Sequence, residues 1–313
     1  MRPRLFGRRA AALATALLLS AGLAVLEAPV AQAAPVCPGA GQPPVLVATV
    51  PGGVLEGMAV DRRGRLYTTD LVTGRVYRID APGAPAYPIA TVPDGGAGGL
   101  AWHPDGSLLV GYGADARVLV GDALLPGALA KLDVETGELR PFASGLSASN
   151  GIAVSREGWV YATNDFGSLV GQVSPDGVVN PAWASTPSAN GAALSADGRY
   201  LYVAHTFAAP GVSRIPVFAP AAQERLVDFG GLDLFAAADG LILDSRDRPI
   251  VPTDVSGEIL RVDGPNQFCA LAGGLPLSST VTYGAGTEGF SEGRLFRGGF
   301  DGAIYEIPGG FDG

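Results

Sequence analysis

The chain has 313 residues, a formal net charge of −9, and many glycines (46) and prolines (25). Its acidic balance disfavours nucleic acid and anionic membranes as partners, because both carry negative charge themselves. Few long segments show the 3.6-residue apolar period of a helix, so we expect many short strands and turns and little helix.

Residues 1–33 have the pattern of a secretory signal peptide. The arginine-rich MRPRLFGRR precedes a short apolar stretch, and AQA offers small residues for cleavage before Ala34. A transmembrane anchor is the alternative, but the stretch is short, rich in Ala and Gly, and soon followed by Glu27. We expect a secreted protein, exported by the general or the twin-arginine route, without membrane association after cleavage. Without the four arginines and Glu27, residues 34–313 keep 17 basic and 29 acidic residues, a net charge of −12.

Residues 34–313 are expected to form one domain, because no linker-like run divides them. The two cysteines of the chain, Cys37 and Cys269, both lie in this exported part, where an oxidising compartment favours a disulfide. The residues before Cys37 lack the lipoprotein pattern, so lipid attachment at Cys37 is not expected. A role for either cysteine as a nucleophile is the less favoured alternative.

A unit of two apolar runs joined by a polar turn recurs along the chain. Successive copies start 42, 52, 40, 49 and 40 residues apart. They read EGMAVDRRGRLYTTD from Glu56, GGLAWHPDGSLLVGY from Gly98, NGIAVSREGWVYATND from Asn150, NGAALSADGRYLYVAHT from Asn190, DGLILDSRDRPIVPTD from Asp239 and STVTYGAGTEGFSEGRLFRGGF from Ser279. In the fourth copy, an Asp-Gly turn is expected to join the two strands.

Most units continue with a third apolar run, such as GRVYRID, and a fourth, such as PAYPIATV. Four short antiparallel strands in each unit of roughly 40 to 50 residues are typical of a β-propeller. We therefore predict an all-β fold with six blades. PPVLVATV at 43–50 is expected to serve as the outer strand of the sixth blade, which closes the ring and brings Cys37 near Cys269 in blade five. A β-sandwich or another blade count is the alternative.

The first residues of the six units would converge at one mouth of the propeller's channel. Four of them carry side-chain oxygens: two carboxylates, Glu56 and Asp239, and two carboxamides, Asn150 and Asn190. Such a set suits a hard divalent cation, above all Ca²⁺, with Mg²⁺, Mn²⁺ or Zn²⁺ not excluded. The alternative is that these residues only cap the turns that enter each strand.

The second strand of each unit runs back to the same mouth and ends in Asp70, Asp165, His205 or Asp254. These side chains can orient ligands or touch a substrate, or they can be hydrogen-bond acceptors within a blade. His205 is the stronger functional candidate, whereas His103 lies in an HPDG turn at the far end. The chain shows no G-x-S-x-G elbow, P-loop, dinucleotide fingerprint or HExxH motif, so we expect neither covalent catalysis through Ser or Cys nor cofactor-binding residues other than the metal ligands.

These residues resemble the senescence marker protein (regucalcin)/gluconolactonase superfamily of six-bladed propellers, with paraoxonase and diisopropyl fluorophosphatase as more distant relatives. The Glu in VLEGMAV, the Asn in SASNGIAVS, the Asn in SANGAALS and the Asp in AADGLILD look like that family's metal ligands. Gly98 stands where paraoxonases place a histidine, so their His-dyad mechanism is not expected here.

The resemblance implies hydrolysis of a small lactone or related ester with a divalent ion, usually calcium, at the mouth of the channel, and the signal peptide predicts that this enzyme is secreted. The resemblance also implies Asp239, or a water that it positions, as general base, and His205 as proton carrier or substrate contact. The loops around 111–127, 165–170 and 206–214 are short of arginine clusters that would suit a sugar acid, so a more apolar lactone or ester is expected. The alternative is a non-catalytic binding module with a structural metal. We expect a monomer.

Overall fold

The computed structural model describes residues 34–229 and 236–313. The signal peptide predicted over residues 1–33 lies outside the described residues. Within the described ranges, no helix is long and apolar enough to cross a membrane.

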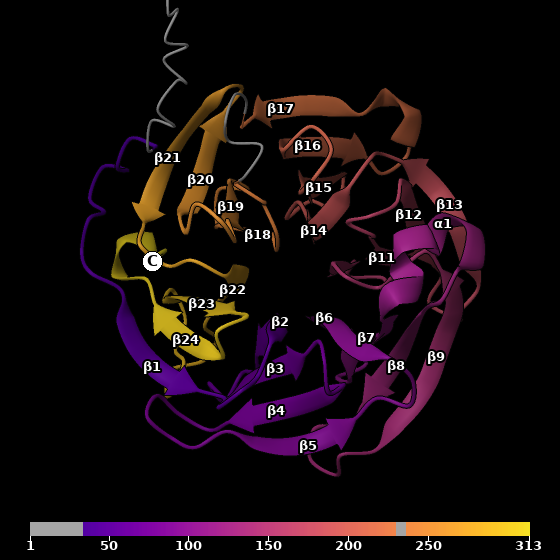
Figure 1. Cartoon of the computed structure of the whole chain (residues 1–313), viewed down its shortest axis with the longest axis horizontal. Coiled ribbons are helices and arrows are strands. Elements are labelled where there is room, and N and C mark those ends of the chain that lie inside the picture. The colour runs from indigo at the N-terminus through magenta and orange to yellow at the C-terminus, as the bar shows by residue number, and fades with distance from the viewer. Residues whose placement is uncertain (1–33, 230–235) are drawn as a thin grey trace, which may run out of the picture. The chain divides into compact units, whose positions relative to one another are not determined.

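The described chain forms six four-stranded antiparallel sheets, arranged as blades around a central axis (Figure 1). The predicted six-bladed propeller is confirmed. Blades 1 and 2 are β2 (Leu55–Val60), β3 (Leu66–Asp70), β4 (Arg75–Ile79) and β5 (Tyr87–Thr91), then β6 (Gly96–Trp102), β7 (Leu108–Ala114), β8 (Gly127–Leu132) and β9 (Leu139–Leu146). Blades 3 and 4 are β10 (Ile152–Val154), β11 (Val160–Ala162), β12 (Leu169–Val173) and β13 (Val179–Ser185), then β14 (Ala189–Leu194), β15 (Tyr200–His205), β16 (Gly211–Pro216) and β17 (Glu224–Asp228). Blades 5 and 6 are β18 (Ile242–Leu243), β19 (Pro249–Pro252), β20 (Ile259–Gly264) and β21 (Gln267–Ala272), then β22 (Ser278–Tyr283), β23 (Leu295–Gly299), β24 (Ala303–Glu306) and β1 (Val45–Thr49).

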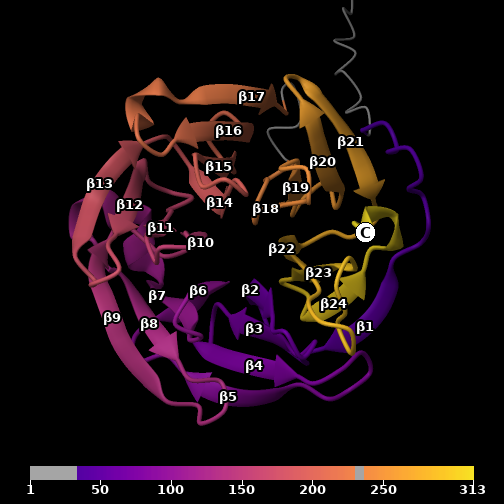
Figure 2. The same ribbon diagram turned by 180° about the vertical axis from the view of Figure 1, so that it is seen from behind.

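The ring closes as the sequence predicts. Strand β1 pairs antiparallel with β24 and completes blade 6, so the first and last strands of the described chain share one sheet (Figure 2). This pairing covers the edge that β24 would otherwise expose. The predicted disulfide is also present: Cys37 and Cys269 are 232 positions apart in sequence, and their Cα atoms are 4.9 Å apart. It ties the segment before β1 to β21 of blade 5.

The hydrophobic core is divided among the contacts between neighbouring blades. For example, Leu66 and Ile79 of blade 1 pack in one cluster with Phe296 and Ile304 of blade 6. Each of the six clusters combines side chains from two adjacent blades. A single blade therefore cannot bury its own faces, which makes ring closure a condition for a complete core.

Helix is scarce, as expected. Within the described residues, helical segments are limited to the 3₁₀ turns η1 (Ala116–Val120), η2 (Pro220–Ala222) and η4 (Pro308–Gly310) and the one-turn helix α1 (Gly121–Leu124). Segments η1 and α1 form an insertion between β7 and β8.

The hairpin between β14 and β15 differs from the Asp-Gly turn expected from the sequence. Five residues, 195–199, connect the strands instead of two. The amide of Gly198 donates to the carbonyl of Ser195, and Gly198 adopts a left-handed conformation with φ +71°. Glycine takes up this backbone conformation without steric strain, which explains its position after Asp197.

Candidate functional site

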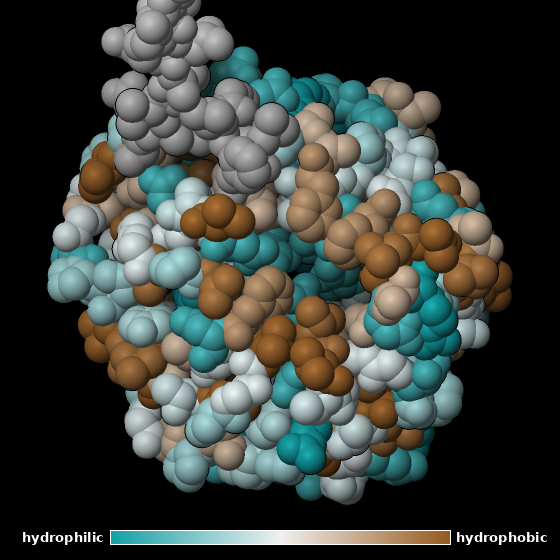
Figure 3. Space-filling model, in the orientation of Figure 1, coloured by the Kyte–Doolittle hydropathy of each residue, from teal (hydrophilic) through white to brown (hydrophobic). Residues whose placement is uncertain are grey.

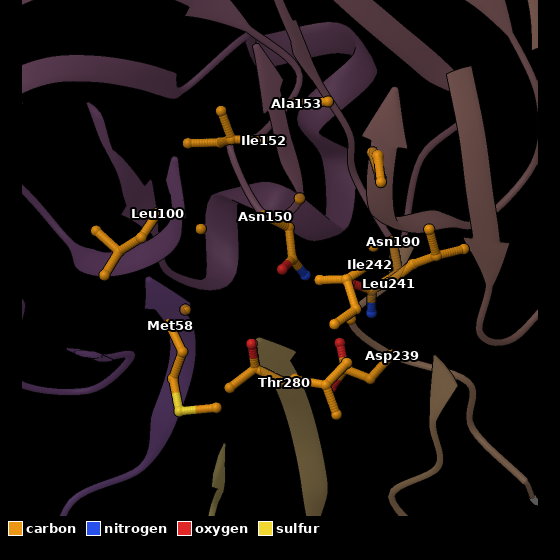
Figure 4. A pocket seen from close by; sticks show the side chains of 18 of the residues that line it. Met58, Leu100, Asn150, Ile152, Ala153, Asn190, Asp239, Leu241, Ile242 and Thr280 are labelled. Atoms are coloured by element: carbon orange, nitrogen blue, oxygen red, sulfur yellow. The ribbon is translucent and has the colours of Figure 1, made fainter. Parts of the chain in front are cut away.

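The four residues predicted to hold a cation face one cavity on the propeller axis. The cavity has a volume of about 320 Å³, and Glu56, Asn150, Asn190 and Asp239 all line it. Figure 4 shows the side chains of Asn150, Asn190 and Asp239 directed towards one another across this space. The structure therefore brings together four side chains that are up to 183 positions apart in sequence.

The strands place these residues at one level. In blades 1 and 4 the residues just before Glu56 and Asn190, Leu55 and Ala189, pair with the last residues of β3 and β15. In blades 3 and 5, Asn150 and Asp239 precede the inner strand by two or three residues instead of lying within it. Backbone hydrogen bonds from Asn150 to Thr163 and from Asp239 to Pro252 still hold them beside the second strands.

A glycine follows each of the four candidate ligands, and two of these glycines show why. A Cβ atom on Gly151 would lie 2.2 Å from the carbonyl oxygen of Asn190, and one on Gly191 would lie 2.1 Å from the amide nitrogen of Leu241. No larger residue fits at these distances without displacing backbone. The missing Cβ atoms thus allow the inner strands of adjacent blades to approach closely and to bring their leading residues onto one axis.

Threonine hydroxyls connect the leading residues of neighbouring blades. Thr69 accepts from the amide of Gly57 at 2.8 Å and donates to the carbonyl of Gly98 in the next blade at 2.6 Å. Thr163 makes the same kind of bridge, because its hydroxyl donates to the carbonyl of Asn190. The sequence pattern did not single out these threonines, although each lies at the end of a second strand: Thr69 is the last residue but one of β3, and Thr163 directly follows β11.

Thr206 fixes the orientation of the Asn190 carboxamide. The Thr206 hydroxyl has one proton, which it donates to the carbonyl of Ala238 at 2.7 Å. It must therefore accept the hydrogen bond from Asn190 Nδ2, which is 2.9 Å away. The amide nitrogen of Asn190 then points at Thr206, and its oxygen is left for the cavity.

The two carboxylates of the site are buried and incompletely paired. Glu56 is 7% exposed and Asp239 3% exposed, yet Glu56 Oε2 and Asp239 Oδ1 have no hydrogen-bond partner. Burial, followed by repulsion from Asp165 and Asp254, raises the pKa of Glu56 well above its ordinary value. Burial and the charges of Glu56 and Asp254 do the same to the pKa of Asp239. The ionised form of each carboxyl group is therefore disfavoured unless a positive charge is brought into the cavity to balance it.

Two of the predicted residues at the ends of second strands join this cluster. Asp254 shares a side-chain hydrogen bond with Asp239 and has an unpartnered buried Oδ1, and burial raises its pKa to about 7. Asp165 hydrogen-bonds with Asn150, and burial raises its pKa as well. Asp70 is different, because its Oδ1 accepts from the amides of Val72 and Thr73 and so forms a local turn. Asp70 is therefore a hydrogen-bond acceptor within its own blade, which is the alternative role that the sequence allowed for it.

Arg297 was not singled out in the sequence but contributes to the electrostatics of this mouth. Its side chain is fully buried in β23 and donates to Ser278 Oγ at 2.6 Å, to Asp301 at 2.8 Å and to the carbonyl of Pro276 at 2.7 Å. Its positive charge lowers the pKa of Asp254, against the larger effect of burial. Its donors are engaged by blade 6, so it does not replace a cation in the cavity.

His205 is buried within blade 4 rather than in the lining of the cavity. Its Nδ1 is 2.7 Å from the carbonyl of Pro187, and its Nε2 is 2.9 Å from Ser213 Oγ. Burial lowers the pKa of His205 to about 4. Because Pro187 lies three residues before Asn190, these contacts fix the chain that enters β14. His103 lies in the β6–β7 turn at the opposite end, as expected, where its ring contacts Asp105.

Strained backbone is concentrated at the same mouth. Of the non-glycine residues with positive φ in the described chain, those on the loops of this mouth are Leu125, Ser188, Ala209, Ala237 and Leu277. Such conformations cost of order 1–3 kcal/mol each and are often found at ligand sites. Their positions support this mouth as the functional end of the propeller.

The donors present fit a hard divalent cation. The set offers two carboxylates and two carboxamides, and a site of this composition matches the oxygen preference of Ca²⁺. The unpartnered atoms Glu56 Oε2 and Asp239 Oδ1 are the kind of groups that a bound cation would satisfy. In the ranges that the structure describes, no group of three or more His, Cys, Asp or Glu side chains is arranged to hold a metal ion. The predicted set contains only two such side chains, Glu56 and Asp239, and its other two members are asparagines.

Solved structures of several other proteins share the fold. A gluconolactonase from Xanthomonas campestris matches with a TM-score of 0.68 at 18% sequence identity, over 88% of this chain and 98% of that chain. Regucalcin from Agrobacterium tumefaciens, described as a calcium-binding protein, matches with a TM-score of 0.66 at 16% identity, over 89% and 96%. A luciferin-regenerating enzyme matches with a TM-score of 0.65 at 15% identity, over 86% and 98%.

This likeness shows the fold. The resemblance to gluconolactonase and regucalcin-like propellers that the sequence predicts is thereby confirmed at the level of architecture. No protein-family model and no curated protein sequence matches the chain. The activity of this protein must therefore be argued from its own residues.

Proposed function

We propose that this protein is a secreted, divalent-cation-dependent hydrolase of lactones or related esters. The observation that carries the proposal is the convergence of Glu56, Asn150, Asn190 and Asp239 on one cavity, with buried carboxylate oxygens that have no partner. The fold likeness to a gluconolactonase and to a calcium-binding regucalcin supports the reaction class and the choice of Ca²⁺.

The four side chains would hold the cation through their oxygens. When bound, a divalent cation supplies polarisation of a carbonyl group and stabilises negative charge on its oxygen. The residues around the ligands prepare this site: Thr206 orients the amide of Asn190, and Asp165 hydrogen-bonds with Asn150. Such outer contacts commonly tune affinity and ligand orientation.

Asp239 is the proposed general base. Its carboxylate would remove a proton from a water whose oxygen attacks the carbonyl carbon of the ester. The carbon–oxygen bond of the ester then breaks, and the proton returns to the leaving alkoxide, giving a hydroxy acid from a lactone. Asp254 is hydrogen-bonded to Asp239 and would orient it.

His205 takes a positioning role in this proposal. Both of its ring nitrogens are engaged by Pro187 and Ser213, so the proton transfer predicted from the sequence would require one of these bonds to open. With both bonds in place, His205 holds the segment that carries Asn190.

A non-catalytic module with a structural cation is the second candidate, because exposed apolar side chains surround the same mouth. A panel of lactones and aryl esters, assayed with Ca²⁺ and with EDTA, separates the two. Cation-dependent turnover that falls at least a hundredfold in Glu56→Gln and Asp239→Asn supports the hydrolase. Asp70→Asn is the matched control, since Asp70 holds only a local turn. Activity untouched by both site variants would refute the mechanism, and cation binding without turnover would favour the binding module.

In either case we propose a monomer whose ligand is a small molecule. Residues 34–313 carry a net charge of −12, which disfavours nucleic acid. The disulfide between Cys37 and Cys269 supports export to an oxidising compartment.

A further inference from the structure

The mouth that carries the candidate site is surrounded by exposed apolar side chains. Figure 3 shows hydrophobic residues gathered around a hydrophilic hollow at the centre of this face. Large apolar residues exposed on the loops of this mouth are Val72, Leu119, Val120, Leu124, Phe166, Phe207, Val255 and Leu277. Apolar surface of this kind, next to a polar cavity, commonly marks a binding site.

Phe166 and Phe207 form an aromatic pair on this surface. Their rings are stacked, with centroids 5.0 Å apart and an angle of 26° between the planes. They come from adjacent blades, Phe166 from the β11–β12 loop and Phe207 from the β15–β16 loop. Phe166 is nevertheless 48% exposed and Phe207 54% exposed, so the pair offers aromatic surface to a ligand.

Each phenylalanine directly follows a residue that is bonded to a candidate ligand of the cation. Phe166 follows Asp165, which hydrogen-bonds with Asn150. Phe207 follows Thr206, which accepts a hydrogen bond from Asn190. The aromatic pair is thus joined to the site through one residue on each blade.

The loops of the two rings are fixed to each other by Ser188. Its hydroxyl donates to the carbonyl of Asp165 at 2.7 Å and accepts from the amide of Phe207 at 2.8 Å. Ser188 has a left-handed backbone with φ 55°, a strained conformation for serine. The amide of Phe166 also donates to Asn164 Oδ1 at 3.0 Å. The exposed pair is therefore preorganised.

A second apolar surface lies on the insertion formed by η1 and α1 (Figure 1), which exposes Leu119, Val120 and Leu124. Asp122 of this insertion accepts hydrogen bonds from blade 3, including one from the amide of Ser168 at 2.8 Å. Asn164 Nδ2 also donates to the carbonyl of Val118 at 3.0 Å. The same asparagine therefore anchors both the insertion and the loop of Phe166.

The charges near this apolar surface favour a small neutral group as its ligand and disfavour a lipid membrane. Arg117 of the insertion is paired with Asp94 at 2.8 Å and with Asp115. The net charge of −12 on residues 34–313 opposes adsorption to anionic lipid. An alkyl or aryl group needs only apolar surface, which the phenylalanine pair and the exposed side chains of the insertion provide.

We propose that Phe166, Phe207, Leu119, Val120 and Leu124 form a subsite for an alkyl or aryl substituent of the ester or lactone, so that the substrate class is apolar. This inference rests on the proposed hydrolase function. Burial of each added methylene would raise kcat/KM by about threefold to fourfold until the surface is covered.

The test is a series of γ-lactones with alkyl substituents of increasing length, assayed in Ca²⁺. In the wild type, kcat/KM is expected to rise with chain length. In the double variant Phe166→Ala, Phe207→Ala, it should fall at least tenfold for the longest member and stay within twofold for the unsubstituted lactone. Phe218→Ala is the control, because Phe218 is 91% exposed in the β16–β17 connection, at the other end of the propeller.

The possible outcomes distinguish failure of the proposed subsite from failure of the proposed hydrolase function. Turnover without dependence on chain length overturns the subsite and leaves the hydrolase intact. If no lactone is hydrolysed, the hydrolase fails, and calorimetric binding of the matching alkyl lactams decides the subsite. Tighter binding of the longer lactams to the wild type, lost in the double variant, supports the subsite, and equal binding overturns it. The subsite would also be overturned if the protein sedimented with phosphatidylcholine vesicles only when both phenylalanines are present, while neither turnover nor lactam binding depended on the length of the alkyl chain. That result would favour a membrane-binding surface.

Discussion

The hydroxyl of Thr206 lies 2.9 Å from Asn190 Nδ2 and 2.7 Å from the carbonyl of Ala238, the residue before Asp239. One hydroxyl of blade 4 thus orients the amide of one candidate ligand and restrains the chain that carries another. The geometry of the cavity depends in this way on contacts between blades, which exist only once the ring has closed.

Replacement of this hydroxyl is expected to weaken cation binding. Thr206→Val has a similar volume but cannot accept from Asn190, so the amide is free to turn its nitrogen into the cavity. We expect Ca²⁺ affinity to fall about 10-fold to 100-fold. Calorimetric titration measures this change, and Thr206→Ser, which keeps the hydroxyl, should restore binding. Equal loss in the serine variant would show that packing, and not the hydrogen bond, is responsible.

The carboxylates of Glu56 and Asp239 are expected to lower the stability of the folded protein without the cation and to raise it when the cation is bound. In EDTA, Glu56→Gln removes a buried carboxyl group whose ionisation is disfavoured by burial and by the charges of Asp165 and Asp254, so the variant should be more stable than the wild type, by about 1 kcal/mol. With Ca²⁺ at a hundred times its dissociation constant, the wild type gains about 2.7 kcal/mol and the variant far less. Urea unfolding under both conditions checks this reversal. A variant that is less stable in both conditions contradicts it.

The close approach of the inner strands makes a strong prediction about glycine. A Cβ on Gly191 would lie 2.1 Å from the backbone nitrogen of Leu241, so Gly191→Ala should destabilise the protein by about 3 kcal/mol or more. Gly264→Ala is the matched control, because the nearest atom to its added Cβ is 3.9 Å away and its φ is not positive. The difference in unfolding free energy between the two variants is the measurement. Equal, small effects would mean that the strands can separate without cost.

The sequence was sufficient to predict the blades, the closing strand and the four residues that face the cavity, because these follow from a repeat, and the disulfide, because both cysteines lie in the part of the chain expected to be exported. Repetition places equivalent residues at equivalent positions without any knowledge of their contacts. It could not distinguish Asp70 from Asp254, which it places at the ends of equivalent strands, although Asp70 is the last residue of β3 and Asp254 lies two residues after β19. Asp70 accepts from the amides of its own loop, whereas Asp254 hydrogen-bonds with Asp239 of the same blade.

Contacts between residues that are distant in sequence explain the features that the sequence could not predict. The partners of His205 lie 18 residues before it and 8 residues after it, and no local pattern marks them. The stacking of Phe166 on Phe207 likewise joins two loops 41 positions apart, each of which alone has only one exposed aromatic residue. Such pairs depend on the geometry of adjacent blades, which the hydrophobic pattern of one blade does not contain.

Loss of the disulfide is expected to destabilise the fold. The bond closes a loop of 232 residues between Cys37 and Cys269, and in the chain-entropy model a loop of this length contributes about 5 kcal/mol. The double variant Cys37→Ser, Cys269→Ser should unfold at lower urea concentration, with a loss of about 2–5 kcal/mol. Reduction of the wild type should reproduce the loss. An unchanged midpoint after reduction would show that pairing of β1 with β24 is sufficient to close the ring.

The burial of His205 predicts a stability that decreases in mild acid. Its pKa is lowered to about 4 in the folded protein, from 6.5 in an exposed imidazole, with Arg225 lowering it and Asp228 raising it as nearby charges. The unfolded chain therefore binds the proton more readily, so stability is unaffected above pH 6.5 and falls as the pH drops from 6.5 towards 4. One pKa unit corresponds to about 1.4 kcal/mol, so the loss at pH 5 is about 2 kcal/mol.

His205→Gln isolates this contribution, because glutamine does not titrate while the carboxylates remain common to both proteins. The difference in unfolding free energy between wild type and variant should narrow by about 2 kcal/mol between pH 7 and pH 5, since only the wild type loses stability through this side chain. Urea unfolding at both pH values measures it. A difference that is constant with pH would mean that His205 is not held neutral by its burial, and its bonds to Pro187 and Ser213 would then have to persist in the charged form.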